Sequence, residues 1–417
     1  MNLHLLPTSL YKSTRVDIFL TAQLRSPSAT ERALTARLLE RGTSPLPDVR
    51  LLNSFLDGLY GAGFGVGVDQ YGSSQVLHAT LEVIDPGYLP AQDDLLGQGL
   101  RFLRDVLSDP SVEGDPCGFP EAVVAQEKEA LRKEIESVFS DKTAYAHRRC
   151  IEIMCAGEPW GIAPHGRSED LWQLNGAGLL ASHKDGLKRH GIDIYVSGGE
   201  PSERVLRLCE ELFSWPREYA SPSRDLTAAP ALEVREVVEE EAVQQGKLVC
   251  GYRTGVTVRD PEYPAMLLLD LLLGGDLHSR LQRSLREERG LCYHVASFIE
   301  PLCGLLFIEA SVDAGDYVEA RSQVDNQLDS LGDRGPDREE LETAKAAVLQ
   351  RLSTMAGDRE ALVRFHFQRR LAGVSAFPAQ LGEQLRSVTS PEVANMARNT
   401  FLDTAFFLRN GKAPSSS

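Results

Sequence analysis

The 417-residue sequence lacks the motifs of several common enzyme classes. No two of its nine histidines form H-x-x-x-H or H-E-x-x-H, no glycine-rich segment ends in G-K-[ST], and no G-x-S-x-G occurs. The first absence argues against a self-contained zinc hydrolase, the second against a P-loop nucleotide-binding protein, and the third against a serine hydrolase of the α/β type. The glycines at 61–67, GAGFGVG, precede a predicted strand rather than a helix, so close backbone packing explains them.

Cysteine usage, hydropathy and charge indicate the cellular compartment of the protein and the partners it can have. The seven cysteines are scattered and include no C-x-x-C, which is typical of buried free thiols in a reducing compartment. No run approaches the roughly 18 apolar residues of a membrane-spanning helix, and the N-terminus does not resemble a signal peptide. The formal net charge of -16 disfavours nucleic acid and anionic membranes as partners. We therefore expect a soluble cytoplasmic protein.

The length of the chain favours two domains of about 200 residues each, because a single core seldom grows larger. A segment rich in proline, alanine and serine, without hydrophobic periodicity, occupies 215–232. We predict a linker there, an N-terminal domain over 1–214 and a C-terminal domain over 233–417.

The two predicted domains repeat the same order of features. A strand at Arg15–Leu24 matches one at Lys247–Gly255, and each is followed by a helix, a glycine break and two further strands. Each half then has a long helix with a lysine and an aspartate thirteen residues apart, and each ends in an apolar strand running into glycine, at Asp193–Gly199 and Ala405–Gly411. Four matches in one order indicate a duplication of one α+β domain.

Two histidines are candidates for metal or structural roles. His147 and Cys150 would share one face of a helix, but no third ligand is evident nearby. His78 and Glu82 lie at even spacing on one face of a predicted strand, where a cross-strand structural role is favoured.

The segment Gly274–Val295, GGDLHSRLQRSLREERGLCYHV, carries a pair of hydrogen-bond donors on rigid elements. Arg286 lies near the end of a predicted helix, and Tyr293 follows the turn at Gly290 on a predicted strand. Spacing alone favours a structural interpretation, with the arginine near a helix C-terminus and the tyrosine at the surface.

This segment resembles the substrate-contact signature of the insulinase/pitrilysin-type zinc peptidase family, which includes the processing peptidases of mitochondria. The resemblance covers essentially the whole chain, including the duplication. It implies two homologous domains, each a mixed, mainly antiparallel β-sheet covered by helices. It also implies that Arg286 and Tyr293 contact the substrate beside a zinc centre in another domain.

The catalytic helix of the family has no counterpart of the same chemistry in this chain. The corresponding segment reads RALTARLLERGT, so that the two histidine ligands become Ala33 and Arg37 and the general base becomes Ala36. Glu134, or a neighbouring glutamate, matches the third ligand of the family. One carboxylate beside an arginine cannot hold zinc, so we expect no metal and no complete catalytic set in this chain.

The segments Leu56–Ala62 and Glu127–Cys150 resemble the bacterial branch of the family that lacks the zinc motif. Members of that branch usually accompany a zinc-bearing homologue. The resemblance implies a non-catalytic subunit that closes a peptide chamber, with zinc in the partner and a peptide or unfolded polypeptide as substrate. A homodimer is also compatible with it. The alternative is a scaffold protein of the same fold without a role in proteolysis, associated in some members of the branch with modification of elongation factor P.

Overall fold

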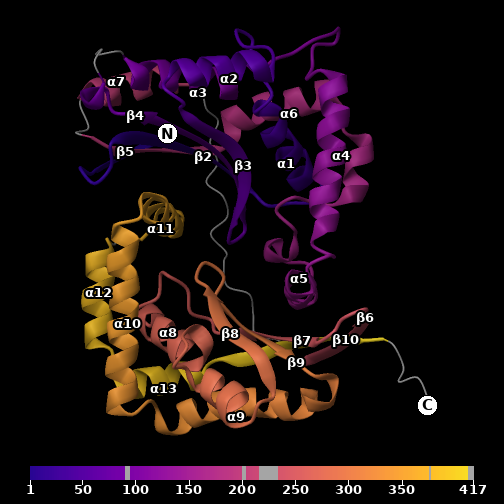
Figure 1. Cartoon of the computed structure of the whole chain (residues 1–417), viewed down its shortest axis with the longest axis vertical. Helices are drawn as coiled ribbons and strands as arrows, with labels where there is room; N and C mark the ends of the chain where they lie inside the picture. Colours follow the sequence, from indigo (N-terminus) through magenta and orange to yellow (C-terminus); the bar gives the residue numbers. More distant parts are fainter. Residues whose placement is uncertain (90–93, 200–202, 216–232, 375–376, 412–417) are drawn as a thin grey trace. The chain divides into compact units, whose positions relative to one another are not determined.

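The computed structural model describes residues 1–89, 94–199, 203–215, 233–374 and 377–411, which divide into two compact units (Figure 1). The first unit comprises Met1–Ser137 and Ile162–Ser223, and the second comprises Val138–Gly161 and Arg224–Ser417. The predicted linker, 215–232, lies outside the described residues except for Trp215. The domain limits 1–214 and 233–417 remain a prediction.

The first unit is built on a five-stranded sheet with the order β1-β5-β2-β4-β3. β1 pairs with β5 in parallel, whereas the other neighbours are antiparallel. The strands are β1 (Asn2–Pro7), β2 (Ser13–Gln23), β3 (Gly63–Tyr71), β4 (Ser74–Ile84) and β5 (Gly191–Gly198). The helices are α1 (Ser28–Leu39), α2 (Val49–Gly58), α3 (Leu95–Ser108), α4 (Glu121–Ser137), α6 (Gly176–Arg189) and α7 (Glu203–Leu212), with the 3-10 turns η1 (Pro86–Tyr88) and η3 (Ser168–Gln173).

One face of the first sheet packs against helices. Along β2, the buried residues Val16, Ile18 and Leu20 occur at every second position and share a core with Leu34 of α1 and Leu103 of α3. Successive side chains of a strand point to opposite faces, so this spacing directs all three toward the helices.

The other face of the first sheet carries buried polar side chains, among them His78 and Asp17, which pair with one another. His78 of β4 is directly opposite Phe19 in β2, and the two rings stack with centroids 4.2 Å apart. Its Nε2 lies 2.9 Å from Asp17 Oδ1. Burial lowers the pKa of His78, but hydrogen bonds to Asp17 and Asp69 outweigh this effect and leave it above its ordinary value. These contacts agree with the structural role predicted for this histidine.

The second unit repeats the sheet of the first, with the order β6-β10-β7-β9-β8. Its parallel pair is β6 with β10, at the same place in the order as β1 with β5, and the other pairs are antiparallel. The strands are β6 (Arg235–Glu241), β7 (Gly246–Arg253), β8 (Cys292–Glu300), β9 (Leu305–Val312) and β10 (Phe401–Asn410). The predicted α+β fold, with a mixed and mainly antiparallel sheet in each copy, is confirmed.

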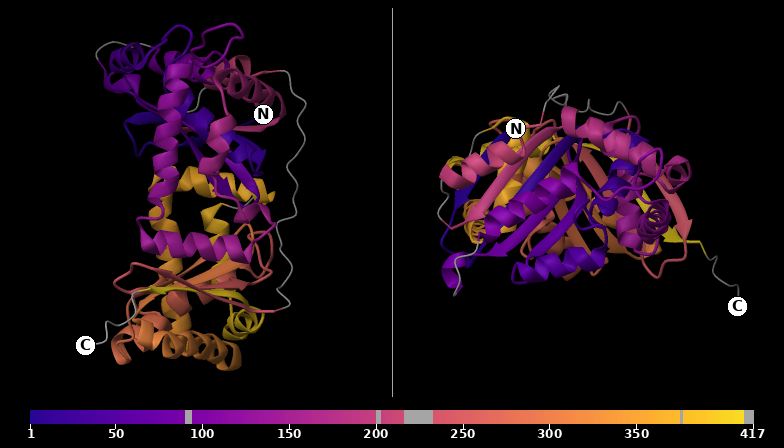
Figure 2. Two further views of the ribbon diagram at one scale, coloured as in Figure 1. Left: turned by 90° about the vertical axis from the view of Figure 1, so that its right-hand side faces the viewer. Right: turned by 90° about the horizontal axis from the view of Figure 1, so that it is seen from above.

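Helices cover both faces of the second sheet (Figures 1 and 2). Phe406 belongs to the core that includes Met154 of α5, whereas its neighbour Phe407 stacks on Tyr317 of α9 from the opposite face.

Among the described residues, no helix is long and apolar enough to cross a membrane. The helices of the second unit are α5 (Lys142–Met154), α8 (Tyr263–Asp270), α9 (Tyr317–Arg334), α10 (Arg338–Ala356), α11 (Arg359–Ala372), α12 (Pro378–Ser387) and α13 (Ser390–Arg398), with the π-helical turns η4 (Leu271–Gly275) and η5 (Gln282–Glu288) and the 3-10 turns η2 (Pro159–Gly161) and η6 (Ala314–Asp316).

The lysines that mark the duplication in the sequence have equivalent contacts. Lys128 of α4 donates a hydrogen bond through Nζ to the carbonyl oxygen of Leu174, at 2.5 Å. Lys345 of α10 donates in the same way to the carbonyl oxygen of Arg386, at 3.1 Å. Each lysine ties a long helix to the chain just before a later helix of the same unit.

The aspartates thirteen residues later also have one role in both copies. Asp141 accepts hydrogen bonds from the backbone at the start of α5, and Asp358 does the same at the start of α11. Each therefore caps a new helix. The long helices predicted over 127–142 and 344–359 are wrong at their ends, because α4 stops at Ser137 and α10 at Ala356, and α5 and α11 are separate helices.

The helix α5 packs on the second sheet, although it precedes the first sheet's last strand in the sequence. Cys150 and Met154 are buried in the core with Val249 of β7. A Cβ atom added at Gly251 would lie 2.6 Å from the sulfur of Met154, so glycine allows the helix to approach the strand. His147, on the same helix, pairs with Glu309 of β9 at 2.7 Å.

Candidate functional site

Ala33, Ala36 and Arg37, which the resemblance aligns with the zinc motif of the peptidases, lie together on α1 in the first unit. Ala33 and Ala36 are buried in the core, with 2% and 1% of their surface exposed. Arg37 lies four residues after Ala33 on the same face of the helix. Its side chain is partly exposed and reaches α4.

The guanidinium of Arg37 binds two carboxylates of α4. Its Nε lies 2.9 Å from Glu127 Oε2, and its Nη1 lies 2.8 Å from Glu134 Oε2. The two glutamates are seven residues apart, which places them on one face of α4 two turns apart. Arg41 pairs with the second oxygen of Glu127. We call these four residues, Arg37, Arg41, Glu127 and Glu134, the arginine–glutamate cluster.

Charge is balanced within this cluster. Two guanidinium groups face two carboxylates, and the Glu127 side chain is 1% exposed. A buried carboxylate is tolerated only when it is paired, so the arginines stabilise the position of Glu127. Glu40, which follows α1, accepts a hydrogen bond from the Val66 amide at 2.6 Å. Burial raises the pKa of Glu40, although this hydrogen bond and the nearby arginines oppose the shift.

The residues of this cluster do not fit a catalytic zinc ion. Zinc in peptidases takes three protein ligands from histidine and carboxylate, with one position open. Here the histidine positions are Ala33 and Arg37, and the carboxylates of Glu127 and Glu134 are engaged by arginine. Over the described ranges, no group of three or more His, Cys, Asp or Glu side chains is placed to hold a metal ion.

Sequence reasoning identified Glu134 and Arg37 but missed Glu127 and Arg41. Both were detectable from helical spacing. Arg41 is one turn after Arg37, and Glu127 is two turns before Glu134, so each extends a charged face already under consideration. The sequence did not reveal that these two faces meet, because α1 and α4 are about 90 residues apart.

Arg286 and Tyr293 lie in the second unit, on the adjoining elements η5 and β8. The buried side chain of Gln282 in η5 donates to the Val295 carbonyl of β8 at 2.7 Å. Between them Gly290 has φ of 64°, a left-handed conformation that glycine adopts without strain. The Leu291 amide then closes the turn on the Leu285 carbonyl at 2.8 Å. The two donors are therefore held by a fixed turn.

A β-bulge sets the direction of the tyrosine. The pairing of β8 with β9 shifts register between Cys292 and His294, which leaves Tyr293 as the extra residue. Tyr293 and His294 are consequently both exposed, where regular alternation would bury one of them. Tyr293 has 68% of its surface exposed.

Neither donor is engaged by another described residue. In the part of the chain that the structure describes, the side chains of Arg286 and Tyr293 make no hydrogen bond or ion pair, and both residues are exposed. Burial raises the pKa of the Cys292 thiol to about 11, although the Arg286 guanidinium opposes this shift. Arg286 therefore lies within electrostatic reach of the residue that precedes Tyr293.

Glycines at the start of the segment serve internal packing. A Cβ atom added at Gly274 would lie 2.8 Å from the backbone nitrogen of Ser297 in β8. The contact with β8 favours the packing explanation for Gly274.

We predict that Glu300, at the end of β8, makes the stability of the second unit dependent on pH. Burial raises the pKa of Glu300 to about 7, although a hydrogen bond from the Leu302 amide opposes this shift. The folded state then holds the proton longer than the unfolded state, so stability falls as pH rises toward 7 and stays lower above it. Glu300→Gln should be more stable than the parent by about 2 kcal/mol at pH 8 and by much less at pH 5.

Urea unfolding at both pH values measures this difference. Glu288→Gln is the matched control, because Glu288 is exposed at the end of η5. An equal change in unfolding free energy at pH 5 and pH 8 for Glu300→Gln would contradict the prediction.

Comparison with known proteins identifies relatives along the whole chain. Residues 174–348 match the family model described as the peptidase M16 inactive domain. The chain is 29% identical over 412 residues to a probable inactive metalloprotease of Bacillus subtilis, YmfF, covering 99% of this chain and 96% of that protein. It is 21% identical over 328 residues to an uncharacterized zinc protease of the same species, YmxG, covering 77% and 78%.

Solved structures show the same fold. A conserved protein from Enterococcus faecalis aligns with a TM-score of 0.91 at 24% identity, covering 99% of this chain and 97% of that one. A peptidase M16 inactive domain from Pseudomonas fluorescens aligns with a TM-score of 0.78 at 18% identity, covering 99% and 97%. Over residues 174–348 in sequence, and over nearly the whole chain in fold, this protein is similar to the M16 peptidases, the insulinase/pitrilysin-type family that its sequence resembles, and its relatives include a protein described as inactive.

Proposed function

We propose that this chain is the non-catalytic subunit of a heterodimeric M16 zinc peptidase. One contrast carries the proposal. Arg37, which the resemblance aligns with a histidine ligand, pairs with Glu127, whereas the donors Arg286 and Tyr293 are exposed and make no hydrogen bond or ion pair with the described residues. A chain that contacts peptide but holds no metal can contribute to hydrolysis when it is paired with a homologue that binds zinc. Zinc, two histidines and the general base belong to that partner.

Tyr293 would act on the reacting carbonyl of the peptide. Negative charge develops on the carbonyl oxygen during hydrolysis, and a hydroxyl donor about 3 Å away stabilises it. The bulge in β8 supports this role, since it leaves the tyrosine exposed to solvent. The exposed hydroxyl needs no other bond to be broken before it donates.

Arg286 would hold the peptide in register. A guanidinium presents several donors in a fixed plane and binds neighbouring carbonyl oxygens or a carboxylate. Such positioning lowers the activation free energy of hydrolysis, because the entropic cost of orienting the reacting groups is met when the peptide binds. The substrate class is a peptide or an unfolded polypeptide, and β8 supports this class because it is the last strand of its sheet and offers an unpaired edge to an extended chain.

The arginine–glutamate cluster also bears on which assembly is active. A homodimer of this chain would contain two such clusters and no zinc ligand set. Hydrolysis in the cytoplasm therefore requires the heterodimer, and a homodimer would be an inactive storage or scaffold form.

Co-purification tests the pairing. A tagged form of this chain is expressed in its native cell and purified, and the bound proteins are identified by mass spectrometry. We expect a homologue with H-x-x-E-H in equal amount, in a complex of the mass of one chain of each. Recovery of this chain alone, or with components of elongation factor P modification and no zinc-bearing homologue, would favour the scaffold function instead.

A further inference from the structure

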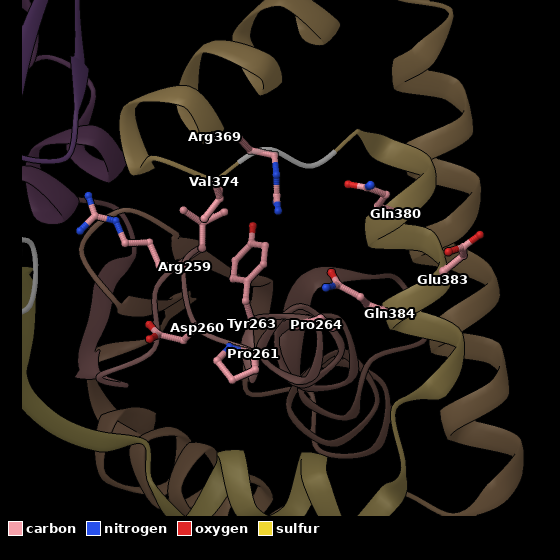
Figure 3. Close-up of a pocket in the computed structure, with 11 residues that line it drawn as sticks. Arg259, Asp260, Pro261, Tyr263, Pro264, Arg369, Val374, Gln380, Glu383 and Gln384 are labelled. Carbon is pink, nitrogen blue, oxygen red and sulfur yellow. The ribbon is translucent and has the colours of Figure 1, made fainter.

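The second unit contains a cavity that the proposed function does not use. Its volume is about 580 Å³, and it lies between the loop before α8 and the helices α11 and α12 (Figure 3). Small-molecule sites in proteins span roughly 300–1,000 Å³. The cavity is therefore large enough for a small organic ligand.

A buried arginine without a polar partner points into this cavity. Arg369, in the last turn of α11, has 5% of its surface exposed. Its guanidinium is directed toward the space between Tyr263 and Gln380 (Figure 3). Its Nε and Nη1 atoms are buried and make no hydrogen bond. Its side chain contacts the ring of Phe365, one turn earlier, at 5.4 Å.

Such an arrangement is costly for the unliganded protein. A cation removed from water needs an opposite charge or several acceptors, and a single aromatic contact replaces only part of its hydration. Burial accordingly lowers the pKa of Arg369. A bound anion would supply the missing acceptors, because one carboxylate accepts two parallel hydrogen bonds from a guanidinium.

Neighbouring groups complete a site for a carboxylate and its attached body. The ring of Tyr263 is 8% exposed, and its hydroxyl points toward Arg369 (Figure 3). Burial raises the pKa of Tyr263, although Arg369 opposes the shift, so the hydroxyl keeps its proton and can donate it in a hydrogen bond. Gln380 and Gln384 line the cavity from α12 and offer amide groups, and Val374 offers an apolar surface.

The charges around the cavity favour a monoanion. Asp260 accepts bonds from the backbone and hydroxyl of Thr257, at 2.7 and 2.8 Å, so it does not pair with Arg369. Glu383 is exposed at the rim, and Glu300 acts on Tyr263 from the protein side. The lining holds two guanidinium groups, of Arg259 and Arg369, and two carboxylates, of Asp260 and Glu383. Their charges cancel, so a monoanion meets less repulsion from the carboxylates than a phosphate dianion does.

We propose that this cavity binds the carboxylate of a small organic acid, either free or as the C-terminus of a short peptide, with Arg369 as its anchor. The site is independent of Arg286 and Tyr293, which lie on other elements of the unit. It is also independent of the pairing with a zinc-bearing subunit, so the isolated chain tests it.

Calorimetric titration of the full chain with defined probes tests the proposal. N-acetylphenylalanine carries the carboxylate, N-acetylphenylalaninamide has the same body without charge, phenyl phosphate carries a dianion, and trialanine presents a peptide C-terminus. We expect at least one carboxylate probe to bind with a Kd of about 1 mM or tighter. The amide and the phosphate should bind at least tenfold more weakly. Tighter binding of N-acetylphenylalanine would identify the ligand as a free organic acid, and tighter binding of trialanine would identify it as a peptide C-terminus.

Arg369→Met is the decisive variant, and Arg364→Met is its matched control on the same helix, where the Arg364 side chain is 43% exposed and pairs with Glu360. Arg369→Met should weaken the carboxylate at least tenfold and leave the unfolding midpoint of the unliganded chain unchanged or higher. Arg364→Met should bind within twofold of the parent. Absence of carboxylate binding, tighter binding of the phosphate, or a lower midpoint for Arg369→Met would overturn the proposal.

Discussion

Tyr293→Phe is expected to lower kcat of the reconstituted heterodimer by about a hundredfold, with little change in KM. The substitution removes only the hydroxyl, whose proposed bond forms with the oxygen that becomes charged in the transition state. An interaction made only in the transition state affects kcat rather than substrate binding. Because the ring remains and is exposed, the fold and the assembly of the two subunits should be unaffected.

Peptide hydrolysis by the zinc-bearing subunit mixed with parent or variant chain measures this effect. Tyr88→Phe is the matched control, since Tyr88 is also exposed, at 55%, and lies in the other unit. Arg286→Ala should raise KM as well as lower kcat, and Arg289→Ala, three residues along and paired with Glu319, is its control. Normal cleavage by both Tyr293→Phe and Arg286→Ala would rule out the substrate-contact role.

Loss of both arginines of the arginine–glutamate cluster is expected to cost about 3–5 kcal/mol of stability. In Arg37→Met/Arg41→Met, the carboxylate of Glu127 stays buried without a cationic partner, because these two residues supply both of its ion pairs. The carboxylate must then either remain charged in a poor environment or take up a proton. Either outcome destabilises the folded state.

A third substitution separates this cause from a general packing defect. Adding Glu127→Leu to the double variant removes the unpaired charge and should recover most of the lost stability. Arg132→Met, at a solvent-accessible ion pair of the same helix α4, should change the stability little. Urea unfolding measures the free energies of unfolding of the parent, the double variant, the triple variant and Arg132→Met. If Glu127→Leu does not restore stability to the double variant, the arginines do not stabilise the fold by pairing with Glu127.

The duplication could be predicted from sequence because its signals are local. Strand patterns, glycine breaks and the lysine–aspartate spacing repeat in order, and the structure gives that spacing a physical basis in the helix caps of Asp141 and Asp358. The position of α5 could not be predicted in this way. Its packing on β7 depends on contacts about 100 residues apart, such as Met154 against Gly251, and no local pattern encodes them.

The candidate site was predictable in its residues but not in its geometry. Chemical identity and family resemblance single out Arg37, Arg286 and Tyr293. The bulge that exposes Tyr293 was not predictable, because one extra residue in β8 leaves the apolar pattern of the strand almost unchanged. The partnership of Arg37 with Glu127 likewise depends on how α1 and α4 pack, and Arg369 gave no signal in the sequence because only its burial makes it unusual.

Zinc content and peptide hydrolysis, measured together on three samples, test whether this chain is the non-catalytic subunit of a zinc peptidase. The samples are this chain alone, the zinc-bearing homologue alone, and their equimolar mixture. We expect no stoichiometric zinc and no hydrolysis for this chain. For the mixture we expect one zinc per pair and hydrolysis well above that of the homologue alone. Chelator-sensitive hydrolysis by this chain alone, or a mixture no more active than the homologue, would contradict this function.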